Sequence, residues 1–256
     1  MKVSFLIPTR RTKWQQKLIE NIYKQTSDKK NIEILFAVDE DDGSSIQNLN
    51  GLKGKFWNNI KIYKRPRTKF INNDYYNWLA EKATGELLWV YADDLLLTEP
   101  NWDIKILPLI DKFLSEPKRK DRVACMSIRD NTPPPSHRLP KFPCFPMFTK
   151  EALKALGWLF YPDIPNWGAD YVTYQTYNPV GRLLEIMDRN YINHVSYHTK
   201  QVPMDEVSKR LGSIFNALKM VPKHNTDRIL SETVPRFRRK LNAYIEQHGG
   251  EPKYGG

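Results

Sequence analysis

Clusters of acidic side chains follow apolar segments of the chain that are typical of buried strands. Asp39 follows the run IEILFAV, and Asp93 and Asp94 follow the run ELLWVY. In an open parallel sheet, ligands bind beyond the carboxyl ends of the strands, so these side chains are expected at one edge. Adjacent carboxylates there are neutralised well by Mg²⁺ or Mn²⁺, which prefer oxygen ligands and bridge to phosphate oxygens. A third acidic pair, Asp163 and Asp170, lies further along the chain.

The interpretation of these acidic residues has an alternative, because an acidic pair taken alone is most often a solvated turn. Their position directly after apolar runs favours a ligand site instead. Three arginines, Arg10, Arg65 and Arg67, have the side-chain chemistry to contact phosphates or a base, because a guanidinium group suits bidentate contacts. The alternative for each arginine is a solvated surface residue.

Several well-defined motifs are missing from the sequence. It contains neither G-x-x-x-x-G-K-[ST] nor G-x-G-x-x-G, which disfavours a P-loop enzyme and a dinucleotide oxidoreductase. It also lacks the H-E-x-x-H zinc motif and the G-x-S-x-G nucleophile elbow.

Alternating strands and helices must position these residues. Apolar runs and helical periodicity predict a mostly parallel sheet that is covered on both faces, and hence an α/β fold. A proline-rich loop over residues 132–148 interrupts the pattern. The predicted strands are residues 3–7, 32–38, 60–63, 86–91, 122–128 and 191–195; the predicted helices are residues 12–25, 72–83, 102–114, 151–156, 170–177, 204–218 and 227–246.

Composition limits the classes of protein. The 256 residues carry a formal net charge of +11, which favours polyanionic partners such as nucleotides, nucleic acid or anionic lipid surfaces. No apolar run is long enough for a membrane span, and the N-terminus reads as a strand rather than a signal peptide. The two cysteines, Cys125 and Cys144, are expected to be reduced, as in a cytoplasmic protein of bacterial or viral origin.

Three segments resemble a known family. FLIPTRR, EILFAVDEDDGSS and ATGELLWVYADD are similar to the nucleotide-sugar half of GT-A fold glycosyltransferases, particularly those of family 2. The resemblance implies a Rossmann-like nucleotide-binding half with a mostly parallel sheet, followed by an acceptor half. It divides the chain into a GT-A domain over residues 1–200, with halves at 1–98 and 99–200, and a basic helical tail over 201–256.

The resemblance also implies roles for residues of the first half. Pro8 and Thr9 match the end of the family's first strand, Asp39 matches the residue that contacts the base, and Asp93 matches the metal-binding second Asp of the Asp-x-Asp motif. Tyr91 stands where the family has the first Asp, so the usual carboxylate contact to the ribose is missing. Asp94 is then a candidate to share the metal.

The second half carries a looser resemblance. Asp170 falls where family members have an acidic residue near the acceptor, which implies a general base, with Asp163 as its competitor. His198 falls in a segment that resembles the histidine metal ligand of many GT-A enzymes, and His194 is the alternative. Trp158 and Trp167 bracket the acceptor side, where one of them could stack on a sugar or base.

The resemblance and the acidic residues together predict a metal-dependent glycosyltransferase. It would use Mn²⁺ or Mg²⁺ to transfer a sugar from a nucleotide-sugar donor, UDP-linked rather than GDP-linked, to an acceptor hydroxyl, with inversion. Two alternatives stay open. One is the same chemistry on a hydroxylated base in viral DNA, flipped into the acceptor pocket, and the other is a non-catalytic nucleotide- or nucleic-acid-binding protein of this fold.

Overall fold

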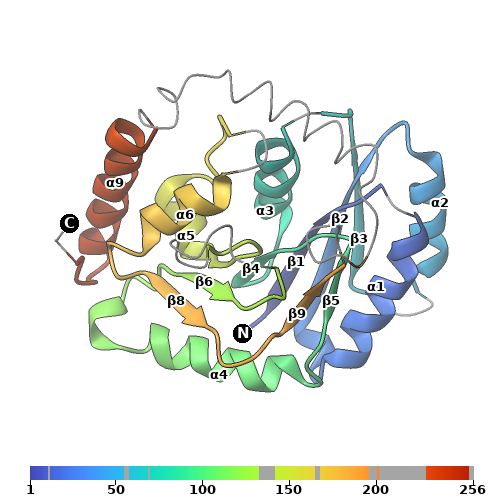
Figure 1. Ribbon diagram of the computed structural model, residues 1–256, viewed down its shortest axis with the longest axis horizontal. Coiled ribbons are helices and arrows are strands. Elements are labelled where there is room, and N and C mark those ends of the chain that lie inside the picture. Colours follow the sequence, from blue (N-terminus) through green and yellow to red (C-terminus); the bar gives the residue numbers. More distant parts are fainter. Residues whose placement is uncertain are drawn as a thin grey trace.

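The computed structural model describes residues 1–10, 12–54, 58–68, 70–132, 142–164, 168–195, 201 and 229–253. Within these ranges seven strands form one sheet in the order β3-β2-β1-β4-β7-β6-β8, and β5 pairs with β9 in a second, two-stranded sheet. Strand β7 runs antiparallel to its neighbours β4 and β6, and the other pairings in the large sheet are parallel. Helices cover both faces (Figure 1), which is the predicted α/β architecture.

The strands are β1 (Val3–Pro8), β2 (Ile32–Asp39), β3 (Ile60–Arg65), β4 (Leu87–Val90), β5 (Leu95–Leu97), β6 (Cys125–Ile128), β7 (Met147–Thr149), β8 (Leu183–Ile186) and β9 (Ile192–His194). The α-helices are α1 (Thr12–Gln25), α2 (Gly43–Leu52), α3 (Trp78–Lys82), α4 (Trp102–Leu114), α5 (Lys150–Leu156), α6 (Ala169–Tyr177) and α9 (Val234–Gln247). Single turns of other helix types are the 3₁₀ segments η1 (Lys29–Asn31) and η3 (Pro117–Arg119) and the π-helical segments η2 (Asn72–Asn77) and η4 (Ile229–Thr233).

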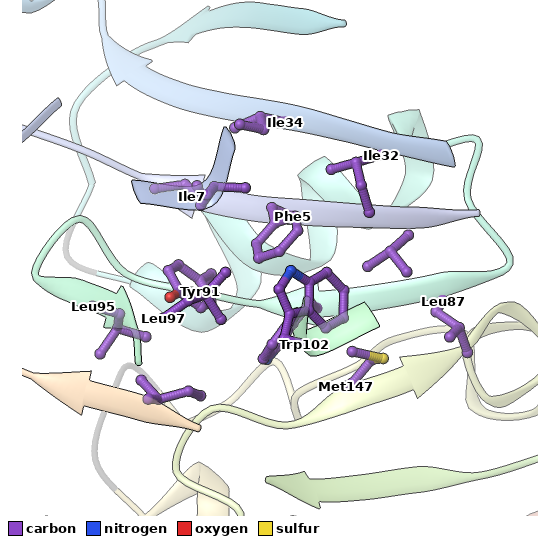
Figure 2. Packing of buried hydrophobic residues seen from close by; sticks show 14 of the residues in the cluster. Phe5, Ile7, Ile32, Ile34, Leu87, Tyr91, Leu95, Leu97, Trp102 and Met147 are labelled. Atoms are coloured by element: carbon purple, nitrogen blue, oxygen red, sulfur yellow. The ribbon is translucent and has the colours of Figure 1, made fainter. Parts of the chain in front are cut away.

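Two apolar layers hold the helices on the sheet. Strands β1 and β2 are buried on both faces, as expected for the centre of a parallel sheet, and most of their residues are apolar. One layer joins the sheet to α1, α2 and α4, and Phe5, Tyr91 and Trp102 pack together in it (Figure 2). The other layer joins the opposite face to η2, α3, α5, α6 and α9.

The C-terminal helix is part of this second layer. The predicted helix over residues 227–246 is described from Ile229 onward as η4 and α9, whereas the helix predicted over 204–218 lies outside the described residues. Phe237 packs edge-on against Trp158, with ring centroids 4.7 Å apart. Lys240 donates to the Leu156 carbonyl at the end of α5, so α9 is anchored by both apolar and polar contacts. None of the described helices has the length and apolar character needed to cross a bilayer.

Four short elements were not expected from the sequence. Helix α2 begins in what the sequence presents as an acidic turn, where Asp42 caps the helix by accepting from the Ser45 amide at 3.1 Å. Strands β5, β7 and β8 have three or four residues each, too few for a periodic pattern. The prediction of loop up to residue 148 is wrong at its end, because β7 begins at Met147, immediately after Pro146.

Strand register brings the predicted site residues to one edge. Pro8 of β1 lies opposite Ala37 of β2, and Asp39 of β2 lies opposite Arg65 of β3. Strand β4 runs parallel to β1, and the Tyr91 amide extends the pairing by donating to the Leu6 carbonyl. The carboxyl ends of these strands therefore form one rim, called here the donor rim, which carries Thr9, Arg10, Asp39, Arg67, Asp93 and Asp94.

Candidate active site

The first part of the donor rim joins the ends of β1 and β4. The Thr9 hydroxyl donates to Asp93 Oδ2 at 2.9 Å, and the Arg10 amide approaches the same oxygen at 3.4 Å. Both Asp93 and Asp94 are 8% exposed, so the two carboxylates are close to the surface without projecting from it. Two groups from the residues directly after β1 thus fix the orientation of Asp93.

The second part of the rim is centred on Asp39. Its Oδ2 atom lies 2.5 Å from Arg10 Nε and 3.4 Å from Arg67 Nε, and its Oδ1 atom accepts from the Tyr75 hydroxyl. Burial alone lowers the pKa of Arg10, but the Tyr75 hydroxyl and Asp39 outweigh it and raise that pKa. Burial, followed by the hydrogen bond to Asp39, raises the pKa of Tyr75. Two guanidinium groups and one phenol hydroxyl thus converge on the Asp39 carboxylate.

Side chains behind the rim hold Thr9 in place. The buried Gln15 of α1 donates to the Thr9 hydroxyl at 3.3 Å and accepts from Asn48 of α2 at 2.8 Å. Pro8 ends β1 directly before Thr9, whose amide donates to the Ala37 carbonyl at 3.0 Å. The rim is thus supported from α1, α2 and β2 together.

Tyr91, which replaces the first Asp of the motif, is not a rim residue. Its ring packs edge-on against Phe5 and Trp89, with centroids 5.1 and 5.4 Å away, and it is 0% exposed (Figure 2). Its hydroxyl is buried without a hydrogen-bond partner in the described part of the chain. The substitution therefore adds a large aromatic side chain to the core, and no carboxylate from this position reaches the rim.

Asp94 faces a histidine from the second sheet. Leu95 of β5 pairs with His194 of β9, and this brings His194 Nε2 to 3.7 Å from Asp94 Oδ1. His194 Nδ1 lies 3.1 Å from the Thr132 hydroxyl. His194 is thus the described histidine beside the acidic pair, whereas the predicted ligand His198 lies outside the described residues.

The acidic pair fits one mode of divalent-cation binding. Within the described ranges, no group of three or more His, Cys, Asp or Glu residues could hold a metal ion. Mg²⁺, however, is commonly held by one or two carboxylates together with substrate phosphates and water, and does not need a complete protein cage. Asp93 and Asp94 supply hard oxygen donors of that kind. They therefore suit a cation that binds together with a diphosphate.

Asp170 lies in the first turn of α6, after Gly168. Burial is the main influence on its carboxyl group and raises its pKa, although the Tyr171 amide, which donates at 2.9 Å, acts in the opposite direction. Its competitor Asp163 is exposed and accepts from the Tyr161 hydroxyl two residues before it. The environment of Asp170 is thus the more suitable for a group that takes up a proton.

Arg65 is placed differently from the other two arginines. Its guanidinium lies over the rings of Tyr75 and Trp78, at 5.4 and 5.1 Å from their centroids, and pairs with Asp74 at 3.7 Å. Although Arg65 lies opposite Asp39 in the strand register, its side chain lines a cleft beside α3 and pairs with Asp74 instead of Asp39. Trp167, the second acceptor-side tryptophan, lies outside the described residues.

Sequence reasoning missed two residues of the site. Tyr75 lies in a segment predicted as a helix, and only the packing of η2 over the sheet shows that its hydroxyl reaches Asp39. Gln15 looks like an ordinary polar residue of an amphipathic helix, yet it is fully buried behind Thr9. The helical spacing could have identified Gln15. It lies four positions before Ile19, on the face of α1 that also carries the buried Leu18 and Ile22.

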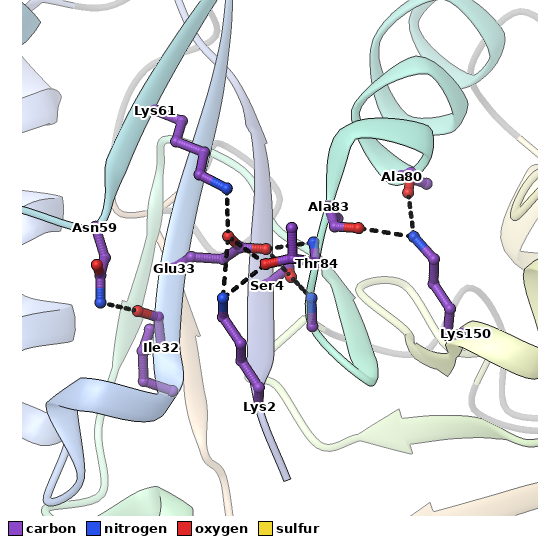
Figure 3. Close-up of polar contacts among 11 residues, drawn as sticks. Lys2, Ser4, Ile32, Glu33, Asn59, Lys61, Ala80, Ala83, Thr84 and Lys150 are labelled. Atoms are coloured by element: carbon purple, nitrogen blue, oxygen red, sulfur yellow. Dashed lines mark hydrogen bonds and ion pairs between the residues drawn. The ribbon is translucent and has the colours of Figure 1, made fainter.

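A second buried carboxylate lies at the opposite end of β2. Glu33 accepts from the Ser4 hydroxyl and the Thr84 amide at 2.6 Å each, and from Lys61 at 2.8 Å (Figure 3). Burial acts to raise the pKa of Glu33, but hydrogen bonds from Lys61, Ser4 and Thr84 outweigh it and lower that pKa to about 2. We call these residues, with Lys2, the Glu33 cluster.

Comparison with known structures identifies the fold. The chain matches S. aureus TarS in complex with UDP at a TM-score of 0.59 and 15% identity, covering 96% of this chain and 80% of that one. It matches the mannosyltransferase PcManGT from Pyrobaculum calidifontis, in complex with GDP-Man and Mn²⁺, at 0.58 and 12%, covering 96% and 85%. It matches GalNAc-T7 with UDP, GalNAc and Mn²⁺ at 0.58 and 15%, covering 98% and 55%.

These similarities show that the chain has the GT-A fold, which confirms the fold implied by the sequence resemblance. No protein-family model and no curated protein sequence matches the chain. At 12–15% identity the structural likeness establishes the architecture, and the chemistry has to be argued from the donor rim itself.

Proposed function

We propose that this protein is a metal-dependent glycosyltransferase that transfers a sugar from a nucleotide-sugar donor to an acceptor hydroxyl. The observation that carries the proposal is the donor rim, where Asp39 with two arginines lies at the carboxyl end of β2, and Asp93 with Asp94 follows β4 on the other side of β1. This is the edge at which open α/β sheets bind their ligands. Solved structures of the same fold contain UDP or GDP-mannose, two of them together with Mn²⁺.

Each part of the rim has a role in binding the donor. Asp39 accepts hydrogen bonds from the base, and a base with an N–H beside carbonyl groups, such as uracil, suits a charged acceptor. Arg10 and Arg67, with side chains 44% and 54% exposed, are free to swing toward the diphosphate. We propose UDP rather than GDP as the nucleotide, because two of the three similar structures contain UDP and one contains GDP-Man.

Asp93 and Asp94 would hold Mn²⁺ or Mg²⁺, with His198 as a further ligand and His194 as its alternative. The cation would neutralise the departing diphosphate as a Lewis acid. Thr9 orients Asp93 by donating to Oδ2. Residues 1–98 would then form the half of the protein that binds the nucleotide-sugar donor.

Asp170 is the proposed general base of the acceptor half, residues 99–200. A base works best when its pKa lies near the working pH, and burial raises the pKa of Asp170 in that direction. It would remove the proton from the acceptor hydroxyl as that oxygen attacks the anomeric carbon. Direct attack of this kind inverts the configuration of the sugar.

The proposal is tested by binding and donor hydrolysis. Calorimetry with UDP and GDP, each with and without Mn²⁺, should show metal-enhanced binding of UDP. Asp93→Ala should lower hydrolysis of the UDP-sugar by about 10²–10³-fold or more, while circular dichroism and thermal melting show a folded protein. Asp111→Ala, which removes an exposed carboxylate of α4, is the matched control. Full activity of Asp93→Ala would contradict the metal assignment.

The formal charge of +11 favours a second candidate acceptor, a hydroxylated base in DNA. A flipped base would then occupy the acceptor side. Binding of duplex DNA should weaken steeply with salt, because each phosphate contact releases counterions. Affinity that stays constant between low and high salt would leave a glycan as the acceptor.

A further inference from the structure

A cleft of about 250 Å³ lies outside the donor rim, between the η2–α3 segment and the chain that follows α5. Arg65, Asp74, Trp78 and Glu81 line one side, and Trp158 lines the other. No residue of the donor rim belongs to the lining of this cleft. The two places are linked only indirectly, because Arg65 of the cleft lies over the ring of Tyr75, which donates to Asp39. The cleft is therefore a separate place where a ligand could bind.

The two walls of the cleft are fixed to each other. Asn77 accepts from the Leu159 and Phe160 amides at 2.9 and 3.0 Å and donates to the Phe160 carbonyl at 2.7 Å. Trp158 packs against Phe237 of α9, with ring centroids 4.7 Å apart. The cleft is thus preformed, and a ligand would lose little affinity to the ordering of its walls.

Polar groups in the lining remain available for a ligand. In the described part of the chain, neither the Trp78 nor the Trp158 indole N–H donates a hydrogen bond. Within the same residues, the Glu81 carboxylate forms no side-chain hydrogen bond or ion pair. Arg65 Nε is buried and also lacks a hydrogen-bond partner there. Asp74, by contrast, already accepts from Thr68 and Asn73. Because the Arg65 Nε atom is itself buried, the lining offers a ligand two indole donors and the Glu81 carboxylate as an acceptor.

The chemistry of these groups selects the ligand. The lining holds one guanidinium and two carboxylates, of which Asp74 pairs with Arg65 at 3.7 Å, and this balance disfavours a diphosphate and favours a neutral molecule with many hydroxyl groups. The indole of Trp158 supplies an apolar surface for the C–H face of a sugar ring, whereas the Trp78 ring is already occupied by Arg65 and Lys82, at 5.1 and 4.7 Å. The volume is below that of pockets for drug-sized ligands and suits a single hexose.

We propose that this cleft between Trp78 and Trp158 is a saccharide subsite that binds one sugar residue of a glycan. Its place in the reaction, as a remote contact for a glycan acceptor, rests on the proposed function. Binding of the saccharide itself does not depend on that function. The cleft would then select acceptors that extend beyond the sugar that receives the transfer.

The test is nuclear magnetic resonance of the indole N–H groups in the full chain, which has seven tryptophans. Trp78→Phe and Trp158→Phe assign two of the signals. The probes are the methyl glycosides of glucose, galactose, mannose and N-acetylglucosamine at millimolar concentrations. At least one glycoside should shift the Trp78 and Trp158 signals saturably. If none of the four shifts them, the proposal is wrong.

Two variants measure the contribution of single groups. Glu81→Gln and Trp158→Phe should each weaken the saccharide affinity about three- to tenfold, as expected for the loss of one hydrogen bond. The matched controls are Glu246→Gln, on the exposed part of α9, and Trp14→Phe, on α1. Equal affinity of the cleft variants and the wild type would overturn the subsite, and thermal melting checks that each variant is folded.

UDP with Mn²⁺ in the same samples separates this proposal from the proposed function. Saccharide binding without UDP binding would leave the subsite standing and contradict the donor rim. UDP binding without saccharide binding would do the reverse. Displacement of the bound glycoside by UDP would assign the cleft to the nucleotide and overturn the subsite.

Discussion

Strand β2 carries two buried carboxylates, one near each end, and their surroundings differ. Glu33 and Asp39 are six residues apart, so they point to the same face of the sheet, and each is 1% exposed. Burial therefore does not distinguish them. The difference lies in the groups that neutralise each carboxylate.

The Glu33 cluster is satisfied mostly by neutral hydrogen-bond donors of the fold, although its cationic partners Lys2 and Lys61 are 36% and 38% exposed. Glu33 Oε1 accepts from Ser4 and Thr84, and Oε2 accepts from Lys61 and from the Thr84 hydroxyl (Figure 3). Gly85 completes it, because its amide donates to the Ser4 hydroxyl and a side chain there would collide with Ser4, with a Cβ only 2.4 Å from that oxygen. No further ligand is needed to satisfy this carboxylate.

Asp39 is neutralised mostly by side chains that reach into solvent. Its two guanidinium partners come from Arg10 and Arg67, both about half exposed, and the third partner is the hydroxyl of Tyr75. Arg67 also contacts the exposed Asp41 at 3.1 Å. Exposed partners can exchange protein contacts for ligand contacts at little cost. Internal saturation thus indicates a structural carboxylate, and exposed partners indicate a binding one.

The largest expected effect on stability comes from the Glu33 cluster. Glu33→Gln should lower the free energy of unfolding by about 3 kcal/mol at neutral pH, because the pKa of this buried carboxyl is lowered from 4.5 to about 2. Urea denaturation measures the change, with Glu246→Gln as the control for loss of an exposed carboxylate. UDP binding should stay unchanged. A loss of UDP affinity without a loss of stability would reverse the roles assigned to the two ends.

The same cluster sets a pH dependence of stability. The pKa of Glu33 in the folded state lies below its unfolded value, so its stabilisation is complete above about pH 5 and is lost as the pH falls toward 2. The difference in free energy of unfolding between wild type and Glu33→Gln should therefore shrink over that range. Urea denaturation at several pH values measures it, and a constant difference would contradict the low pKa.

The sequence predicts the frame of the molecule because its central elements are long and strongly patterned. Helices α1 and α4 have the predicted bounds, and strands β1 and β2 differ from the prediction by a single residue at one end. Asp39 and Asp93 were identified by their position after such strands, and a parallel sheet then brings them to one rim. Long local patterns thus carry both the core and the main acidic residues.

What the sequence does not reveal depends on tertiary contacts. Strands β5 and β7 have three residues each and are defined by their partners in the sheets. The contact of Tyr75 with Asp39 and the three hydrogen bonds of Asn77 join segments whose separation along the chain is 36 to 83 residues.

A smaller effect is expected at the other end of β2, and on binding rather than stability. Asp39→Asn removes a charged acceptor and should weaken UDP binding about 30-fold, equivalent to about 2 kcal/mol. The free energy of unfolding should change by less than about 1 kcal/mol, because Arg10 and Arg67 can turn to water. Calorimetry and urea denaturation measure the two quantities. A stability loss as large as that of Glu33→Gln would remove the distinction between the two carboxylates.

The smallest effect is expected from Tyr75→Phe, which removes the one buried donor to Asp39 and keeps the aromatic ring under Arg65. Without this hydroxyl, Asp39 is oriented by exposed arginines alone, so UDP affinity should fall about fivefold, or about 1 kcal/mol. Combined with Asp39→Asn, the substitution should cost almost nothing more, because the hydroxyl acts through that carboxylate. Calorimetry on the four proteins of this cycle measures the coupling. Additive losses would show that Tyr75 contacts the nucleotide directly instead of positioning Asp39.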